Sequence, residues 1–166
     1  MGKYLITGRP GSGKTTVIES LRRRGFQSFN TDDMPEITKL EEQETGKPVP
    51  WPEDVVDWKR YVWNWQEAGL RKLLQNEGDI FIGAVVGNQQ KFYPLFDKVF
   101  ALTVSVETLQ KRLDSHAHLR TAREKERAVA VHYIKQARFE KQGLVLIPAD
   151  GSVDEVINDI LAQLKN

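Results

Sequence analysis

Five short apolar runs recur along the chain, and longer stretches of helical period separate them. The runs are uninterrupted, which is typical of strands that are buried on both faces of a parallel sheet. Apolar residues between them recur about once per helical turn, which predicts amphipathic helices. The expected strands are 4–6, 26–29, 80–82, 99–102 and 144–147. One helix is expected to begin near residue 14. Four more are expected at about 65–75, 106–114, 124–141 and 153–164. This alternation predicts βα units and therefore an α/β fold.

Two polar stretches interrupt the alternation. The first contains TGKPVPWPED, with three prolines, and separates the second and third expected strands. It is too long for a turn, so we expect a small subdomain or flap at about 34–65. The second, HAHLRTAREKER, interrupts the connection after the fourth strand, at about 115–127. Neither resembles a linker between domains, and we expect one domain over 1–166.

The composition is that of an ordinary globular protein, with 40% hydrophobic and 28% charged residues. No apolar run approaches the roughly 20 residues that span a bilayer, and the N-terminus does not resemble a signal peptide. The chain has no cysteine, which suits a reducing compartment, and we expect a cytoplasmic protein without a membrane partner. The net charge of +1 gives no reason to expect a nucleic-acid partner. No motif specifies an oligomer, so we expect a monomer or a weak dimer.

The strongest motif is GRPGSGKT, which fits the phosphate-loop pattern G-x-x-x-x-G-K-[ST] without a mismatch. It lies directly after a predicted strand and opens a helix, which is where its mechanism requires it. Backbone N–H groups of such a loop point at phosphate oxygens, its lysine reaches the β- and γ-phosphates, and its hydroxyl ligates Mg²⁺. We therefore expect ATP and Mg²⁺ as cofactors, with Thr15 on the metal. The residues expected to bind the nucleotide here are Gly8, Arg9, Pro10, Gly11, Ser12, Gly13, Lys14, Thr15 and Thr16.

Other classes of nucleotide-binding protein lack support. A GTPase needs DxxG and NKxD segments, and the chain contains neither. An oligomeric motor ATPase needs an acid at the end of a hydrophobic strand, whereas the third strand ends in Gly83 and Ala84. A protein kinase carries its lysine on a strand apart from the glycine loop. The small P-loop phosphotransferases remain.

The chain resembles the nucleoside-, shikimate- and gluconate-kinase-like group of P-loop kinases. The resemblance rests on GRPGSGKTT, NTDD, GAVVGNQ and FDKVFALTVSVETLQKRL, and it is strongest to small bacterial proteins described as shikimate-kinase-like ATPases. It implies a three-layer α/β/α sandwich with a five-stranded parallel sheet in the order 2-3-1-4-5. It also implies an acceptor-binding region after the second strand and a lid after the fourth. The run of three glycines that shikimate kinases carry after the third strand is missing.

Two adjacent acids, Asp32 and Asp33, follow the second expected strand, at the sheet edge where ligands of α/β proteins bind. In an extended segment they would point to opposite sides, so at most one faces the site. A carboxylate there could accept a proton from the acceptor hydroxyl or reach Mg²⁺ through water. The resemblance places the base near Asp33, which we therefore prefer, with Asp32 in reserve.

The acceptor side has its own signals. Residues 30–70 contain ten acids and four bases, a balance of −6, which predicts an uncharged or cationic acceptor. Aromatic residues crowd this segment and could stack on a base or a sugar, although they could equally form a local core. Amides and glycines after the third strand could bind a neutral polar group. The candidate acceptor-binding residues are Asp33, Trp63, Trp65, Gly87, Asn88, Gln89 and Arg138.

The donor side is basic, with nine bases and five acids over 105–142. The resemblance implies that Arg120 and Arg123 of the lid close over the triphosphate and neutralise charge during transfer. Arg112 could contribute to nucleotide binding from a neighbouring helix. Gly151 and Ser152 lie in a segment that resembles the adenine-contacting loop of these kinases.

Three functions are compatible with these observations. The first is an ATP- and Mg²⁺-dependent kinase that phosphorylates a hydroxyl of a small nucleoside- or polyol-like metabolite. The second is a nucleoside monophosphate kinase of the adenylate type. The third is a regulatory protein that binds ATP with little or no turnover.

Overall fold

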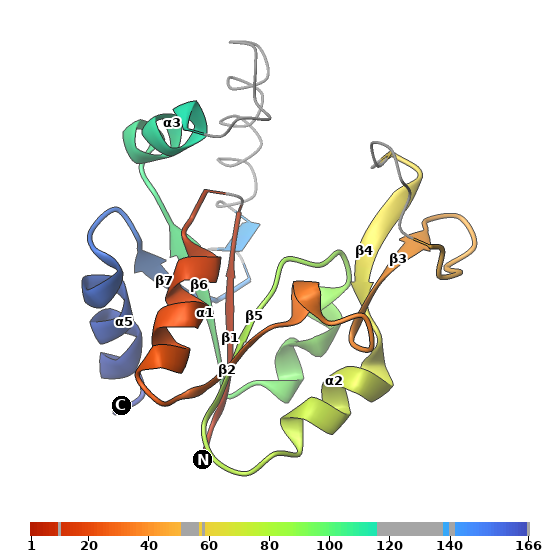
Figure 1. The fold of residues 1–166 in the computed structure, drawn as a ribbon, viewed down its shortest axis with the longest axis horizontal. Coiled ribbons are helices and arrows are strands. Elements are labelled where there is room, and N and C mark those ends of the chain that lie inside the picture. Colours follow the sequence, from red (N-terminus) through yellow and green to blue (C-terminus); the bar gives the residue numbers. More distant parts are fainter. Residues whose placement is uncertain (10, 51–56, 58, 116–137, 140–141, 166) are drawn as a thin grey trace.

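The computed structural model describes residues 1–9, 11–50, 57, 59–115, 138–139 and 142–165. Its main element is a five-stranded sheet in which all neighbouring strands run parallel (Figure 1). The strands are β1 (Lys3–Gly8), β2 (Gln27–Asn30), β5 (Ile80–Gly83), β6 (Lys98–Thr103) and β7 (Val145–Pro148). They lie in the order β2-β5-β1-β6-β7, which is the predicted order 2-3-1-4-5 counted along the chain.

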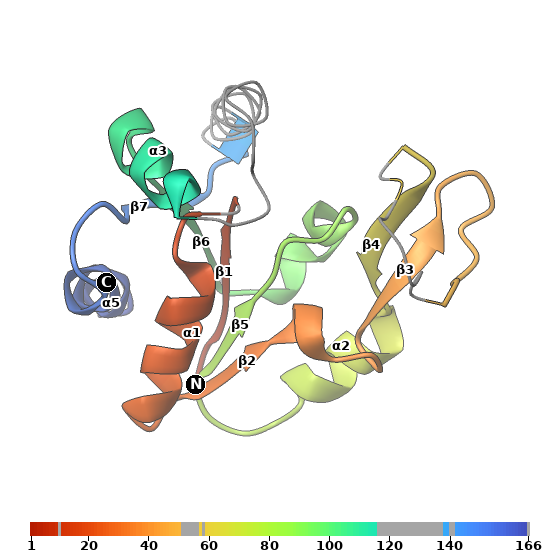
Figure 2. The same ribbon diagram turned by 45° about the horizontal axis from the view of Figure 1, so that its top comes forward.

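Helices cover both faces of the sheet and make three layers, as the views in Figures 1 and 2 show. Neighbouring residues of β1 point to opposite faces and belong to different cores. Ile6 packs in one core with Ile18 and Ile157, and Leu5 packs in the other with Leu70. The first core is covered by α1 (Lys14–Arg23), α3 (Val106–Asp114) and α5 (Val153–Ala162). The second is covered by α2 (Glu67–Leu74) and the 3-10 helix η2 (Gln89–Leu95).

The predicted elements agree with these bounds to within a few residues, and α3 has the predicted bounds. Helix α2 begins at Glu67 rather than at residue 65, because the residues before it form a strand. The helix predicted over 124–141 lies outside the described residues, apart from the helical pair 138–139. In the part of the chain that the structure describes, no helix is long and apolar enough to cross a membrane.

The insertion after β2 contains regular structure that the sequence did not predict. Strands β3 (Thr38–Glu42) and β4 (Tyr61–Trp65) pair antiparallel and form a separate two-stranded sheet. Figure 2 shows this hairpin standing beside the carboxyl ends of β2 and β5. A short 3-10 helix, η1 (Thr31–Asp33), connects β2 to it. The hairpin therefore stands beside the sheet edge at which ligands of α/β proteins bind.

Trp65 anchors the hairpin to the main sheet. Its side chain is 2% exposed, and its indole N–H donates to the Thr31 hydroxyl at 2.9 Å. Its ring packs against Phe92 with the ring centroids 5.7 Å apart. The side-chain amide of Asn88 bonds both the N–H and the carbonyl of Trp65, each at 2.9 Å. Trp65 and Asn88 therefore build the core and its attachment, and neither lines the two cavities described below.

Candidate functional site

The phosphate loop joins the end of β1 to the start of α1. Gly11 and Gly13 have φ angles of 88° and 89°, a left-handed conformation that glycine adopts without steric cost. The Ser12 N–H donates to the Arg9 carbonyl at 3.0 Å and closes the turn. A cavity of about 590 Å³ opens above this loop. The loop thus has the strand–turn–helix context that the motif requires.

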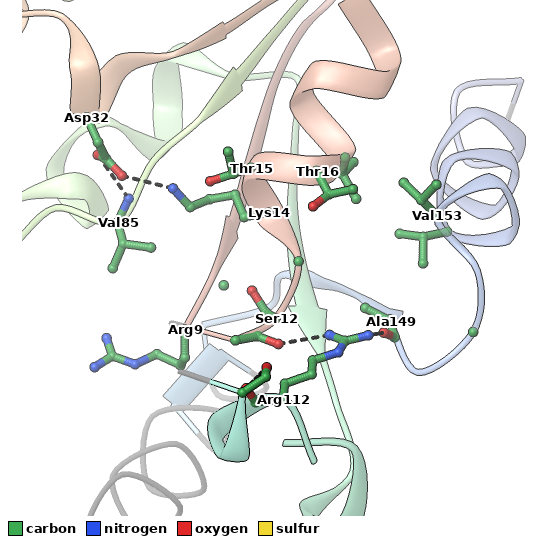
Figure 3. A pocket seen from close by; sticks show the side chains of 17 residues that line it. Arg9, Ser12, Lys14, Thr15, Thr16, Asp32, Val85, Arg112, Ala149 and Val153 are labelled. Carbon is green, nitrogen blue, oxygen red and sulfur yellow. Dashed lines mark hydrogen bonds and ion pairs between the residues drawn. The ribbon is translucent and has the colours of Figure 1, made fainter. Parts of the chain in front are cut away.

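Lys14 contacts an acid across this cavity. Its ammonium lies 2.8 Å from Asp32 Oδ2, with the two side chains 11% and 24% exposed (Figure 3). The other carboxylate oxygen of Asp32 accepts from the N–H of Val85 at 3.4 Å. Asn30 also accepts from the ammonium, at 3.5 Å. One carboxylate thus faces the lysine that the motif assigns to the triphosphate.

The orientation of the two adjacent acids differs from the prediction. Asp33 is exposed, and its carboxylate accepts from the side-chain amide of Asn30 at 2.7 Å. Asp32, which we held in reserve, lines the cavity instead. One acid faces the cavity and the other does not, but the choice that the resemblance suggested is reversed. Both acids lie in the 3-10 helix η1, where the chain turns about a third of a circle per residue, and this turn directs Asp32 to the cavity. An extended segment would have alternated the side chains, but β2 ends at Asn30.

Arg112 joins the phosphate loop to the opposite side of the cavity. One guanidinium nitrogen donates to the Gly11 carbonyl at 2.8 Å, and another donates to the Ala149 carbonyl at 2.7 Å. These bonds connect the loop, α3 and the segment after β7 (Figure 3). Arg112 therefore lines the nucleotide cavity as predicted, but its hydrogen bonds with the described residues go to backbone carbonyls.

The segment after β7 closes the cavity on the donor side. Gly151 lines it, whereas the Ser152 hydroxyl accepts from the Glu155 N–H and caps α5. Hydrogen bonds from Thr108 and Ser105 lower the pKa of the Asp150 carboxyl from its ordinary value. Three residues predicted on the nucleotide side lie outside the described residues: Pro10, Arg120 and Arg123.

A second cavity, of about 700 Å³, lies between the main sheet and the hairpin. It shares Arg9 and Val85 with the nucleotide cavity, so the two spaces adjoin at these residues. The predicted acceptor residues that line it are Trp63, Gly87, Gln89 and Arg138. Tyr61, one of the aromatic residues of the segment that could stack on an acceptor, lines it too. Lining residues that the sequence did not identify are Thr7, Gln43, Val62, Val86, Gln90, Tyr93, Phe139 and Gln142.

Gln89 forms the polar floor of the second cavity. Its side chain is 8% exposed, and its amide nitrogen donates to the Thr7 hydroxyl at 3.1 Å and to the Tyr93 hydroxyl at 2.9 Å. Tyr93 donates in turn to Gln142 at 3.4 Å, and burial raises the pKa of the Tyr93 phenol. These residues come from β1, from η2 and from the segment before β7. Only the fold brings them together, so no local motif could have revealed them.

The acids of residues 30–50 and 57–70 that the structure describes do not line the second cavity. Glu41 accepts hydrogen bonds from Asn64 and Gln66, at 2.8 and 2.6 Å, and Glu42 pairs with Arg60 at 3.0 Å. Among the described residues, the lining of the cavity contains two arginines and no carboxylate. Glu41 and Glu42 are thus engaged in contacts within the hairpin and next to it, and the charge of the acceptor stays a prediction.

Thr15 is placed to serve a metal ion that accompanies a triphosphate. Its side chain lines the nucleotide cavity, and Figure 3 shows the hydroxyl on the side of the loop where Lys14 and Asp32 lie. Within the described ranges, no group of three histidine, cysteine or acidic residues could hold a metal ion alone. Mg²⁺, if bound here, would take Thr15 as one of the one or two protein groups that it usually binds besides water and substrate phosphates.

Comparisons with known proteins agree with this geometry. A search of curated proteins finds no match to the chain. Shikimate kinase from Bacteroides thetaiotaomicron superposes with a TM-score of 0.64 at 15% identity, over 99% of both chains. Shikimate kinase from Acinetobacter baumannii in complex with shikimate gives a TM-score of 0.60 at 17% identity, over 99% of this chain and 93% of that one. Deoxyadenosine kinase from M. mycoides with bound dATP gives a TM-score of 0.54 at 15% identity, over 100% of both chains.

These similarities show that the chain has the fold of small P-loop kinases. The sequence profile of a family described as "AAA domain" matches residues 5–132. This range includes the phosphate loop and the hairpin. The chain belongs to this AAA domain family of nucleotide-binding P-loop proteins, with the fold of a small-molecule kinase.

Proposed function

We propose that the protein is an ATP- and Mg²⁺-dependent phosphotransferase that moves the γ-phosphoryl group to a hydroxyl of a small metabolite in the cytoplasm. One observation carries the proposal: two cavities of about 590 and 700 Å³ adjoin at Arg9 and Val85, and most of the phosphate loop lines the first of them. A protein that only bound ATP would need one cavity. A transferase needs a donor site, an acceptor site and a contact between them.

Asp32 is the proposed general base. In the structure its carboxylate pairs with the ammonium of Lys14 at 2.8 Å. A bound triphosphate competes for the lysine, which leaves the carboxylate available to the acceptor. The acceptor oxygen then bonds to the γ-phosphorus as the bond from that phosphorus to the β-bridging oxygen breaks. The hydroxyl proton passes to Asp32, and ADP is the leaving product.

Thr15 would hold Mg²⁺ through its hydroxyl, and the ion would supply positive charge that offsets the charge on the transferred group. The second cavity would bind the acceptor. Its aromatic wall, with Tyr61 and Trp63, can cover a ring, and the amides of Gln89 and Gln142 can bond hydroxyl groups. These four side chains suit an acceptor with several hydroxyls, and the two arginines of the lining, Arg9 and Arg138, would also allow an anionic group on it.

The test is a screen for acceptor-dependent ADP formation with Mg·ATP. The panel contains polyols, sugars, hydroxy acids, nucleosides and nucleoside monophosphates, and mass spectrometry identifies the phosphorylated product. Lys14→Ala, purified identically, controls for a contaminating kinase. We expect at least one hydroxyl compound to raise ADP formation in the wild type and not in the variant. Tight ATP binding with no acceptor-dependent turnover on the whole panel would refute the proposal.

A further inference from the structure

Arg9 is a half-buried arginine whose charge is not balanced. It follows Gly8 in the phosphate loop, and its guanidinium makes no hydrogen bond or ion pair with any residue that the structure describes. Burial lowers the pKa of this guanidinium, because no partner offsets the loss of water. Arg112, on the other side of the loop, differs in that two backbone carbonyls occupy its guanidinium. An unpaired, partly desolvated cation of this kind is suited to bind an anion that arrives with a ligand.

The position of Arg9 indicates which anion. Arg9 and Val85 are the two residues that line both cavities. In Figure 3 the Arg9 side chain extends toward the side of Val85 and Asp32, away from Arg112. Lys14 and Asp32 form an ion pair here, so their charges cancel. Arg9 therefore carries a positive charge that none of the described residues compensates. A phosphoryl group that passes from one cavity to the other crosses at this point.

We propose that Arg9 binds the γ-phosphoryl group in transit and stabilises the charge that its three equatorial oxygens carry in the transition state. This inference rests on the proposed phosphotransferase function and adds a catalytic residue to it, supplied by the phosphate loop. A planar guanidinium can bond two of these oxygens at once. The bond from the Ser12 N–H to the Arg9 carbonyl fixes the backbone from which this side chain extends. Preorganised charge of this kind acts in the transition state more than in the ground state.

The test needs no knowledge of the acceptor. The probe is Mg·ADP, with or without aluminium fluoride, which mimics the phosphoryl group in transit. The variants are Arg9→Gln and Arg9→Lys, and binding is measured by calorimetry. Arg24→Gln is the matched control, since Arg24 lies at the end of α1 and pairs with Asp154 away from both cavities. Thermal melting checks that every variant is folded.

We expect aluminium fluoride to tighten ADP binding in the wild type and in Arg24→Gln. Arg9→Gln should lose about 10²-fold or more of this tightening, as arginines that contact a phosphoryl transition state contribute about 10³–10⁵ in rate. Its affinity for ADP alone should stay within about threefold, because that ground-state complex lacks the transferred group. Arg9→Lys should recover only part of the tightening, because an ammonium cannot bond two oxygens in one plane.

Two results would overturn the inference. In one, Arg9→Gln keeps the full tightening. In the other, it weakens ADP and the ADP–aluminium fluoride complex by the same factor, which would make Arg9 an ordinary nucleotide ligand. Both are distinct from failure of the proposed function, which is the absence of acceptor-dependent turnover in the wild type. Once an acceptor is known, a raised acceptor KM with unchanged kcat in Arg9→Gln would also refute the role, because Arg9 would then recognise the acceptor.

Discussion

Replacing Asp32 with asparagine should have opposite effects on turnover and on nucleotide affinity. Asparagine keeps the size of the side chain and can still accept the hydrogen bond from Val85, but it cannot take a proton. Loss of a general base costs about 10²–10⁴ in kcat, which corresponds to about 3–5 kcal/mol of barrier. The same substitution removes the ion pair at 2.8 Å to Lys14, which ATP has to break.

The gain in affinity can be estimated from that ion pair. The two side chains are 11% and 24% exposed, so the pair is better shielded than a surface salt bridge. Exposed pairs stabilise by up to about 1 kcal/mol, and each 1.4 kcal/mol is about tenfold in affinity. We therefore expect Asp32→Asn to bind ATP about fivefold more tightly in EDTA, where Mg²⁺ makes no contribution. Asp33→Asn is the matched control, because Asp33 is exposed and bonds Asn30 outside the cavity lining.

The assay combines steady-state turnover on the acceptor that the screen identifies with ATP titration by calorimetry in EDTA. Asp33→Asn should keep kcat and affinity within about twofold of the wild type, since surface changes usually have small effects. Full activity in Asp32→Asn together with an inactive Asp33→Asn would refute the assignment of the base. Weaker ATP binding by Asp32→Asn would refute the competition between Asp32 and the triphosphate for Lys14.

Three further results are expected. Lys14→Ala should abolish acceptor-dependent turnover and weaken ATP binding by more than about tenfold, measured by the same two assays, because it removes the charge on the β- and γ-phosphates. Trp65→Phe should lower the free energy of unfolding by about 1–3 kcal/mol, because the buried hydrogen bond of the indole is lost. Trp63→Phe should instead alter the acceptor KM with little change in melting temperature, because Trp63 lines the second cavity. Hydrogen bonding to Thr108 lowers the pKa of Asp150 below 3.8, so its contribution to stability is present above that pH and is lost as pH falls through the lower folded value. The melting-temperature difference between wild type and Asp150→Asn should therefore be constant from pH 7 to 5 and shrink below pH 4.

The parts of the fold that the sequence predicts are those with a local signal. Each strand of the main sheet is a continuous apolar run, and the phosphate loop is a contiguous motif. Strand β1 and helix α1 flank this motif in the structure, as its mechanism requires. The order of the strands came from a resemblance rather than from any residue, because strand neighbours are set by contacts between distant segments.

The hairpin was missed although both strands carry a signal. Residues 61–65 read YVWNW, and aromatic and β-branched residues favour strands, but we started a helix at the last of them. In β3, Thr38 and Leu40 are buried and Lys39 is exposed, which is the alternation of a half-buried strand. The pairing itself joins Thr38 to Trp65, across a segment with three prolines. Pairing over such a distance has no local signature. The second cavity, which β4 helps to line, could therefore not be predicted from the sequence either.

The choice between the two adjacent acids shows where such reasoning reaches its limit. Alternation along a strand would have assigned one acid to each side, and it holds only while the backbone stays extended. The backbone leaves β2 at Asn30, and the turn of η1 directs Asp32 to Lys14 and Asp33 to the surface. The arrangement with Asp32 in the cavity and the one with Asp33 there differ by only a few hydrogen bonds. Because the two side chains are identical, residue type cannot show which arrangement forms. The paired asparagine variants therefore test the backbone geometry as much as the chemistry. A loss of turnover confined to Asp32→Asn requires that η1 persists when ATP and the acceptor are bound.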